Sequence, residues 1–193
     1  VQQYPKMYEE KPLTIAIMPP INHTTHAEAK DLFYTTMYMP LCEKGYYVYS
    51  PHLTMELFKQ ESAYDAELFI ERDLSIFREV LGADAAMFTI IKEWERMNVS
   101  GIISVRIEYI LRSTKSGETL YKREGQITLD KSLYSGEDGL ALLVDAVSTV
   151  INTSTTDMIH AGRKCNALVL SDMPAGKYSP HFGTDMNKPA KDS

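Results

Sequence analysis

Three short apolar runs in the first half of the chain predict buried strands. Each is apolar on both faces, too short for a helix, and bounded by proline, glycine or polar residues. The runs are residues 13–18 (LTIAIM), 46–50 (YYVYS) and 85–91 (AAMFTII). Pro19 and Pro20 end the first run, because proline has no N–H to offer a strand ladder.

Helical stripes lie between these runs. Apolar residues recur at three- and four-residue spacing from about His26, with Pro40 expected to kink or end the helix and Gly45 to terminate it. A second helix is predicted to begin at Pro51, a favoured first-turn residue, and a third to end at Gly82. The apolar face of the third helix comprises Leu74, Phe77, Val80 and Leu81.

Alternation of apolar and polar residues over 103–129, with Ile110 as the one misfit in the first strand, predicts an antiparallel hairpin. Its two strands are joined by the turn KSGE, where Gly117 can take the left-handed conformation that a short loop requires. The polar face is expected to project Arg106, Arg112 and Lys122 to solvent beside Glu108, Glu118 and Glu124. Mixed charges on a solvated sheet face favour solubility and do not make an anion-binding site.

The last third of the chain predicts a helix, an edge strand and a tail. Ser135 and Asp138 have capping-box spacing and are followed by an apolar stripe that continues to Met158. The run NALVL (166–170) is expected to form a final edge strand. Proline, glycine, lysine and aspartate dominate from Ser171, which predicts a mobile tail or a segment that orders on a partner.

These elements predict one α/β domain. Residues 1–12 are expected as an extended lead-in, residues 13–170 as the domain, and residues 171–193 as a polar C-terminal tail. Strand–helix units followed by an antiparallel hairpin and a long helix are typical of a three-layer sandwich, in which helices flank a mixed central sheet.

Composition and charge exclude several classes of protein. The chain has 193 residues, of which 44% are hydrophobic and 24% charged, as in an ordinary globular domain. Its net charge of −6 argues against a general nucleic-acid binder. The most apolar stretch, residues 140–151, falls short of the roughly 20 residues that cross a bilayer. Because the chain does not begin with methionine, we expect a trimmed form whose targeting segment has been removed.

Candidate chemistry is sparse. His23 and His26 (HTTH) lack further ligands at a readable spacing, so no metal site is predicted. Glu93 and Glu95 flank Trp94 and would share a strand face, which favours a polar rim on an edge strand over paired catalytic carboxylates. Nucleophile elbows and phosphate-binding glycine loops are absent from the sequence. We therefore predict no catalytic, cofactor-binding or metal-binding residues, and no enzyme.

The two cysteines leave two alternatives open. In a cytosolic protein Cys42 and Cys165 would be small buried apolar residues. In an exported protein they are candidates for a disulfide that closes a long loop.

The order of these pieces resembles known envelope proteins. The segments TIAIMPP, LCEKGYYVYSP, GADAAMFTIIKEW and ISVRIEYILRSTKSGETLYKREGQI resemble the N-terminal domain of the TolB family and the periplasmic domain of CsgG-type lipoproteins. YPKMYEEKPLTIAIMPPIN, ESAYDAELFIE and GADA are similar to a family of bacterial lipoproteins of unknown function that includes a neisserial surface lipoprotein. The similarity covers residues 4–180, nearly the whole chain.

The resemblance implies a lipoprotein held at the outer membrane by an acylated cysteine upstream of Val1, facing the periplasm or the cell surface. It implies a protein–protein interaction module, an accessory of a CsgG-like secretion or envelope assembly, whose partner is a CsgG-like lipoprotein or another copy of the chain. It implies no cofactor. The alternative is a small-molecule-binding domain with a cleft at the carboxyl ends of the strands at 13–18 and 85–91. Nucleic-acid binding is the least favoured alternative, because the chain is acidic.

Overall fold

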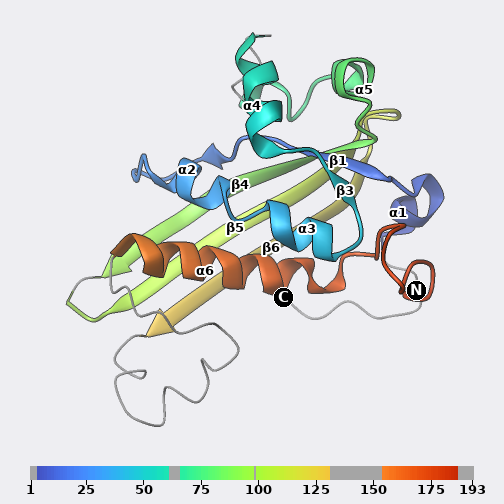
Figure 1. Cartoon of the computed structure of the whole chain (residues 1–193). Coiled ribbons are helices and arrows are strands. Elements are labelled where there is room, and N and C mark those ends of the chain that lie inside the picture. Colours follow the sequence, from blue (N-terminus) through green and yellow to red (C-terminus); the bar gives the residue numbers. More distant parts are fainter. Residues whose placement is uncertain (1–3, 61–65, 98, 131–153, 187–193) are drawn as a thin grey trace.

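The computed structural model describes residues 4–60, 66–97, 99–130 and 154–186. A six-stranded mixed sheet forms its centre (Figure 1), in the order β3-β1-β4-β5-β6, with β2 paired to β4 beside this path. The strands are β1 (Thr14–Ile17), β2 (Ile21–Asn22), β3 (Tyr47–Val48), β4 (Ala85–Met97), β5 (Ile102–Ser113) and β6 (Thr119–Asp130). β1 runs parallel to β3 and β4, whereas β4, β5 and β6 are antiparallel.

Six α-helices and two short 3₁₀ turns are described around this sheet. The helices are α1 (Pro5–Glu10), α2 (Ala29–Tyr34), α3 (Tyr38–Glu43), α4 (Pro51–Gln60), α5 (Ser75–Leu81) and α6 (Ser154–Val169), and the 3₁₀ turns are η1 (Ala66–Leu68) and η4 (Leu170–Asp172). Within the described parts of the chain, no helix combines the length and apolar character that a membrane crossing needs.

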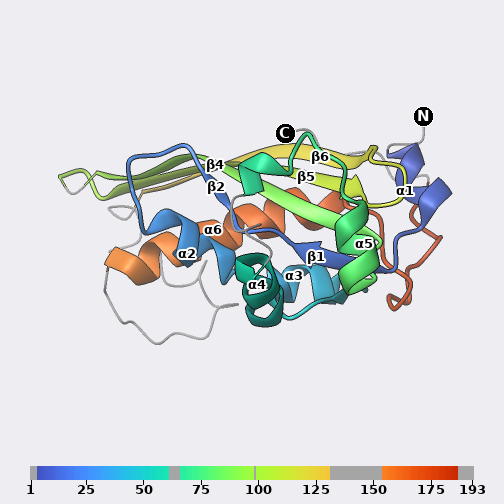
Figure 2. The same cartoon turned by 90° about the horizontal axis from the view of Figure 1, so that it is seen from above.

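The helices cover the sheet on both faces. Successive residues of β4 belong to different apolar clusters, with Ala85 and Met87 in one and Ala86 and Phe88 in the other, so the clusters lie on opposite faces. The larger cluster joins the sheet to α2, α3 and α6, and the smaller joins β2, β4 and β5 to α4, η1 and α5. The predicted three-layer sandwich with an antiparallel hairpin is therefore confirmed (Figure 2).

The sheet face that carries the smaller cluster also bears charged side chains, in the part that α4 and α5 do not cover. Lys92 bridges Glu108 at 2.9 Å and also contacts Glu124, while Lys122 contacts Glu108 from the other side at 2.9 Å. The Lys92 and Lys122 ammonium groups offset the burial of Glu108, and the pKa of this carboxyl is lowered. The solvated mixed-charge face predicted for the hairpin is confirmed for these residues.

One basic side chain of the hairpin departs from that prediction. The Arg112 guanidinium does not project to solvent but donates to the carbonyl oxygens of Ile70 at 2.6 Å and Gly117 at 2.7 Å, which ties the segment before α5 to the β5–β6 turn. Glu118 is exposed as predicted and forms an ion pair with Lys6 of α1 at 2.6 Å. Gly117 takes the predicted left-handed conformation, with φ of 72°.

Several predicted elements differ in extent or type. The single helix expected from His26 is two helices, α2 and α3. Pro40 lies in the first turn of α3, where a backbone N–H would have no acceptor within the helix, so the proline breaks no hydrogen bond. Residues 5–10 form α1, not an extended lead-in. The run at 166–170 belongs to α6 and η4, and the predicted edge strand is wrong, because the buried residues Ala161, Cys165 and Val169 recur at the four-residue spacing of a helix. Val80, expected on a buried face, is 54% exposed.

The sequence-predicted helix with capping residues Ser135 and Asp138 lies outside the described residues. Met158, the last residue of the apolar stripe predicted for this helix, is described; it lies on α6 and is buried in the larger apolar cluster.

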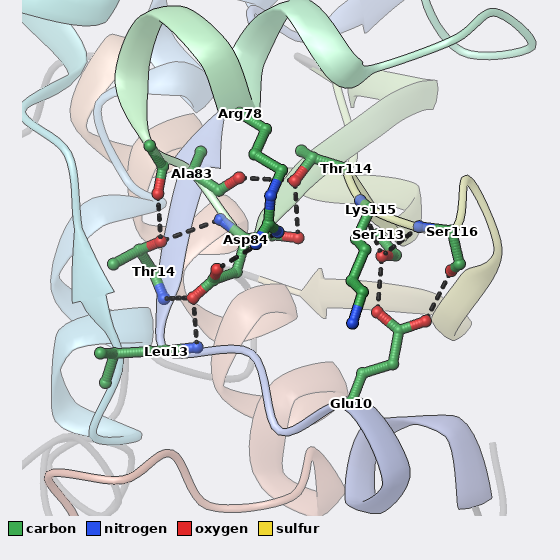
Figure 3. A network of polar contacts seen from close by, with 11 residues as sticks. Glu10, Leu13, Thr14, Arg78, Ala83, Asp84, Ser113, Thr114, Lys115 and Ser116 are labelled. Carbon is green, nitrogen blue, oxygen red and sulfur yellow. Dashed lines mark hydrogen bonds and ion pairs between the residues drawn. The ribbon is translucent and has the colours of Figure 1, made fainter.

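Polar contacts hold the amino ends of β1 and β4 together (Figure 3). The Asp84 carboxylate accepts the backbone N–H groups of Leu13 at 2.9 Å and Thr14 at 3.1 Å. The Thr14 hydroxyl accepts the Asp84 N–H at 2.9 Å and donates to the Gly82 carbonyl at 3.2 Å. These bonds satisfy backbone groups where two parallel strands begin, so they fix the register of β1 on β4.

A second set of contacts in Figure 3 anchors α1. The Glu10 carboxylate accepts the hydroxyls of Ser113 and Ser116, each at 2.5 Å, and thereby holds the helix to the β5–β6 turn. With the Lys6–Glu118 bridge, this gives α1 a fixed place at the end of the hairpin.

A close approach of α6 to the sheet depends on Gly125. A Cβ at this position would lie 2.2 Å from Val169 Cγ2 and 3.2 Å from Cys165 Sγ, so a larger residue would push the helix away from β6. The helix itself presents a stripe of buried residues to the sheet: Met158, Ala161, Cys165 and Val169.

Replacing Gly125 with alanine is therefore expected to lower the free energy of unfolding by about 1–3 kcal/mol, the usual cost of overpacking a filled core. Urea denaturation measures the loss, and Gln126→Ala on the exposed face of the same strand is the control. In the double variant Gly125→Ala/Val169→Ala the loss should be smaller than the sum of the two single losses. Strict additivity would contradict the contact.

Candidate functional site

A groove of about 790 Å³ lies between α3, the carboxyl half of α6 and the segment that follows α6. α3 supplies Met39, Pro40 and Glu43, and α6 supplies Arg163, Asn166 and Ala167. The following segment closes the groove with Asp172, Met173 and His181, among others. Figure 1 shows α3 and α6 on the same side of the sheet, with the residues after α6 passing close to α1.

A buried polar network sets the spacing of the helical walls. Tyr109 of β5 donates its hydroxyl to Asn166 Oδ1 at 2.7 Å. The Asn166 side-chain amide donates to Thr36 Oγ1 at 2.8 Å and to the Thr36 carbonyl at 3.1 Å. All three residues are buried, so the bonds between them are direct and not bridged by water. Together they connect β5, α6 and the link between α2 and α3. Burial raises the pKa of Tyr109 well above its ordinary value, which keeps the hydroxyl a donor.

A buried ion pair fastens the end of α6 to β6. Arg123 of β6 contacts the Asp172 carboxylate, and the two side chains are only 10% and 5% exposed. Tyr121 donates to the Val169 carbonyl at 2.7 Å and to Asp172 at 3.3 Å, while Tyr4 donates to Asp172 at 3.4 Å. Burial, and after it the Asp172 charge, raise the pKa of both tyrosines above the ordinary value. The cluster consists of satisfied groups, which favours a structural latch.

The segment after η4 folds back onto the start of β3. Lys44 Nζ donates to the carbonyls of Ser171 at 2.8 Å and Met173 at 3.2 Å, and the Tyr46 hydroxyl donates to the Pro174 carbonyl at 2.6 Å. These bonds engage the Lys44 ammonium and the Tyr46 hydroxyl and hold the segment in place as one wall of the groove.

Two glycines allow this backbone contact. Gly176 donates its N–H to the Lys44 carbonyl at 2.8 Å, and a Cβ there would lie 2.3 Å from the Gly45 carbonyl oxygen. At Gly45 itself φ is 89°, and a Cβ would lie 2.4 Å from the Ser179 nitrogen. Side chains at either position would separate the segment from β3.

The packing of residues 171–186 differs from the mobility that the sequence predicts for this segment. Met173 and Pro174 are buried, and the Asp185 carboxylate accepts the Ala175 N–H at 2.7 Å and lies 3.4 Å from the Tyr8 hydroxyl. Burial, and beside it Asp185, raise the pKa of Tyr8 to about 12. The division of the chain at residue 171 stays a prediction, because the packing does not test where a domain ends.

Two charged residues of the groove remain available to a ligand. The side chains of Glu43 on α3 and Arg163 on α6 are exposed and form no hydrogen bond or ion pair with another described residue. Lys44, Asp172 and Asp185 also line the groove, but their polar atoms make the contacts given above. The groove therefore offers one charge of each sign, together with the apolar side chain of Met39, which is 60% exposed.

The sequence-predicted cysteine pair remains a prediction. The structure holds both cysteines as free thiols, Cys42 half-buried on α3 and Cys165 buried on α6. Cys165 Sγ lies 3.5 Å from the Gly125 carbonyl oxygen, and burial raises the pKa of this thiol to about 11.

The histidines and glutamates considered in the sequence make surface pairs. His26 Nε2 lies 3.4 Å from Glu95 and its Nδ1 lies 3.5 Å from Glu28, whereas His23 lies 3.6 Å from Glu67. Of the residues that the structure describes, no group of three or more histidine, cysteine, aspartate or glutamate side chains could hold a metal ion.

Glu93 and Glu95 flank a buried tryptophan. Trp94 is 1% exposed, and Glu93 lies 3.7 Å from Arg106 of β5. A bulge at Lys92 shifts the register of β4 here, and beyond Ile91 the described pairing of β4 is with β5 alone. The rim interpretation fits this part of the strand.

The groove does not lie where the sequence places a ligand cleft. At the carboxyl end of β1, the Tyr34 hydroxyl donates to the Ile17 carbonyl at 3.1 Å, and Met18 is fully buried. The groove opens instead beside the amino end of β3. Its residues come from segments more than a hundred positions apart, so local sequence patterns carry no signal for it.

Comparison with known proteins gives one family. The family model described as "Putative lipoprotein GNA1162-like" matches residues 2–177. A curated relative, the "Putative lipoprotein NMB1124/NMB1162" of Neisseria meningitidis serogroup B, is 26% identical over 156 residues, covering 80% of this chain and 72% of the relative.

Solved structures share the fold. Lipoprotein GNA1162 from Neisseria meningitidis superposes with a TM-score of 0.59 at 23% identity, covering 70% of this chain and 95% of that one. A PelC dodecamer from Paraburkholderia phytofirmans gives a TM-score of 0.52 at 14% identity, covering 83% of this chain and 87% of that one.

The Arg123–Asp172 latch is expected to contribute much more to the free energy of unfolding than the exposed Lys6–Glu118 pair does. Asp172→Asn leaves Arg123 buried without a counter-charge and should lower the free energy of unfolding by about 3–5 kcal/mol. Lys6→Ala removes an exposed pair, whose side chains are 42% and 51% exposed, and should cost less than about 1 kcal/mol. Urea denaturation measures both losses. Equal losses would contradict a buried latch, and the apolar pair Arg123→Met/Asp172→Leu should recover most of the stability.

The thiols predict unequal alkylation. Because the thiolate is the reactive form and the pKa of Cys165 is raised to about 11, Cys165 should react with iodoacetamide far more slowly than Cys42 at pH values below that pKa. Mass spectrometry of peptides from the folded chain measures the two rates, and unfolding without reductant is the control. If neither thiol reacts after unfolding, the two cysteines form the disulfide and the free-thiol description is wrong.

Proposed function

The chain belongs to the GNA1162-like family of putative lipoproteins, and from this membership we propose that it is an envelope protein that binds a protein partner in the α3–α6 groove. The description of the family as lipoproteins associates the chain with the cell envelope. The finer parts of the proposal come from the sequence resemblance. They are a lipid tether in the outer membrane, a domain facing the periplasm or surface, and an accessory role beside a CsgG-like lipoprotein.

The groove is the observation that carries this proposal. Glu43 of α3 places an acid on one helical wall of the groove, and Arg163 of α6 places a base on the other. Met39 of α3 also lines the groove and is exposed to solvent. An extended peptide carries polar groups along its length and side chains of either sign, so it complements such a lining better than a compact apolar ligand does. We therefore name an extended segment of a partner protein as the occupant.

The rigidity of the walls supports the same interpretation. Asn166 fixes α6 to the α2–α3 link, and Asp172 fixes the following segment to β6. A preformed groove loses little conformational entropy on binding, which favours recognition of a flexible segment. Further copies of the chain are also candidate partners, since PelC, a protein with this fold, is described as a dodecamer.

A small molecule is the second candidate ligand. The volume of about 790 Å³ falls within the range of small-molecule sites, roughly 300–1,000 Å³. We propose binding and not catalysis in either case, because the buried titratable groups beside the groove, Tyr121 and Asp172, are engaged in the latch.

Site-specific photocrosslinking in the native envelope tests the proposal. A crosslinking residue in place of Arg163 or Met39 should capture one and the same partner protein, and the captured peptide should map to a single extended segment of it. The matched control replaces exposed Val80 on α5, on the other face of the sheet.

The outcomes separate the candidates. Capture of a CsgG-like lipoprotein from both groove positions, weakened by the second-site change Glu43→Arg, would support the accessory role. Equal capture from Val80 would contradict the groove as the binding site. If neither groove position captures protein while native mass spectrometry of the purified chain shows a bound metabolite, the small-molecule candidate replaces the protein partner.

A further inference from the structure

A small apolar pocket lies beside the α3–α6 groove. It has a volume of about 160 Å³ and is formed by α1, the residue before β3 and the segment that follows α6. Figure 1 shows this segment passing close to α1. The walls of the pocket include six apolar or aromatic residues: Met7, Pro12, Tyr46, Pro174, Phe182 and Met186.

The pocket and the groove share a boundary. Tyr8 and Ala175 line both of them. The boundary is held in place from one side, because the Asp185 carboxylate accepts the Ala175 N–H at 2.7 Å and lies 3.4 Å from the Tyr8 hydroxyl. An extended segment that lies in the groove and reaches this boundary can therefore place a neighbouring side chain in the pocket.

Size and polarity select what the pocket holds. An apolar cavity of roughly 150 Å³ takes up one benzene molecule, so this pocket has room for one large apolar side chain. It is too small for a drug-sized ligand, which needs roughly 300 Å³ or more. Phe182 and Met186 are 40% and 42% exposed, and they would lose exposed apolar surface when a side chain fills the space beside them.

One cation stands beside this apolar space. Among the described residues that line the pocket, Lys11 alone is charged. Its side chain is exposed and forms no hydrogen bond or ion pair with another described residue. A free ammonium group next to an apolar pocket favours a ligand with a carboxylate beside its apolar side chain. The residues that follow Met186, NKPAKDS, contain no large apolar side chain, so a second molecule is the better source of one.

We infer that the pocket holds an anchor residue of the partner segment: one large apolar side chain with a carboxylate beside it that pairs with Lys11. The inference rests on the function proposed for the groove, and it adds which side chains the partner segment carries. An apolar anchor in a pocket commonly supplies a large share of the binding energy of an interface. The anchor therefore sets which segment binds, while Glu43 and Arg163 contact the rest of it.

N-acetyl-leucine tests the pocket directly, because it carries one apolar side chain and one carboxylate. Added to the chain labelled at its methionine methyl groups, it should shift the NMR signals of Met7 and Met186 and leave that of Met97, exposed at the end of β4, unchanged. N-acetylalanine should bind about tenfold or more weakly, because it buries less apolar surface. N-acetyl-leucine amide should bind about two- to fivefold more weakly, because it forms no ion pair with Lys11.

Matched variants separate the two contacts. Lys11→Met should give N-acetyl-leucine and its amide the same affinity, whereas Lys115→Met in the β5–β6 turn should preserve the difference between them. Met186→Asp places a charge at the pocket mouth and should weaken N-acetyl-leucine binding, followed at Met7, by about tenfold or more. Because all three positions are exposed, circular dichroism should report the same fold for each variant.

Photocrosslinking connects the pocket to the groove. A crosslinking residue in place of Met186 should capture the same partner protein as one in place of Arg163 or Met39. The captured peptide should carry a large apolar residue next to an acidic residue or a chain terminus. Met186→Asp should weaken capture from Arg163.

Three results would overturn the inference. N-acetyl-leucine could leave Met7 unshifted, or shift Met97 as much as Met7. The Met7 methyl group could show nuclear Overhauser effects to residues 1–3 or 187–193 in the free chain, which would mean that the chain fills its own pocket. Arg163 and Met39 could capture a partner that Met186 does not capture, in which case the groove stands and the anchor fails. If neither Arg163 nor Met39 captures a protein, the function proposed for the groove fails instead, and the anchor with it.

Discussion

The contact of α6 with β6 over Gly125 is the constraint on which the rest of the structure depends. A helix can lie this close to a strand only where the strand has no side chain, and Val169 fills the space above the glycine. This contact places Asn166 within reach of Tyr109 and Thr36, and it delivers Asp172 to Arg123 at the end of the helix. The position of one wall of the groove therefore follows from a missing Cβ.

The two faces of the sheet then acquire different roles. One is covered by α2, α3 and α6, whose packing creates the groove beside the amino end of β3. The other is covered only where α4, η1 and α5 reach, and beyond them it is solvated through the pairing of Lys92, Glu108 and Lys122. A solvated face that satisfies its own charges has little to gain from a partner. Among the residues that the structure describes, the groove carries charged side chains without a described partner, at Glu43 and Arg163.

Elements whose signal is local could be predicted from the sequence. The hairpin followed from alternation over 103–129, and its turn from Gly117; the stop of α5 followed from Gly82, which takes a left-handed conformation with φ of 70°. Ile110 breaks the alternation because it meets the smaller cluster under α4 and α5 on the otherwise solvated face. The absence of metal and catalytic motifs was also evident from the sequence and stays a prediction.

Features that depend on distant partners could not be predicted. Arg112 looks like a solvated base, yet besides the nearby Gly117 carbonyl its acceptors are backbone carbonyls about forty residues earlier in the chain. The run at 166–170 has the composition of a strand, but its helical periodicity shows only against the stripe that begins at Met158. Likewise, the polar composition after Ser171 gives no sign of the few buried contacts that hold this segment. One of them is the hydrogen bond from the Tyr46 hydroxyl to the Pro174 carbonyl.

The most direct measurement of the central claim is a nuclear Overhauser effect between the Gly125 α protons and the Val169 methyl groups in solution. A strong cross-peak, together with one between Cys165 and Gly125, would place α6 on β6 as described. Its absence, with Val169 methyl contacts to solvent or to other strands, would show that α6 packs elsewhere. The groove would then have no fixed wall.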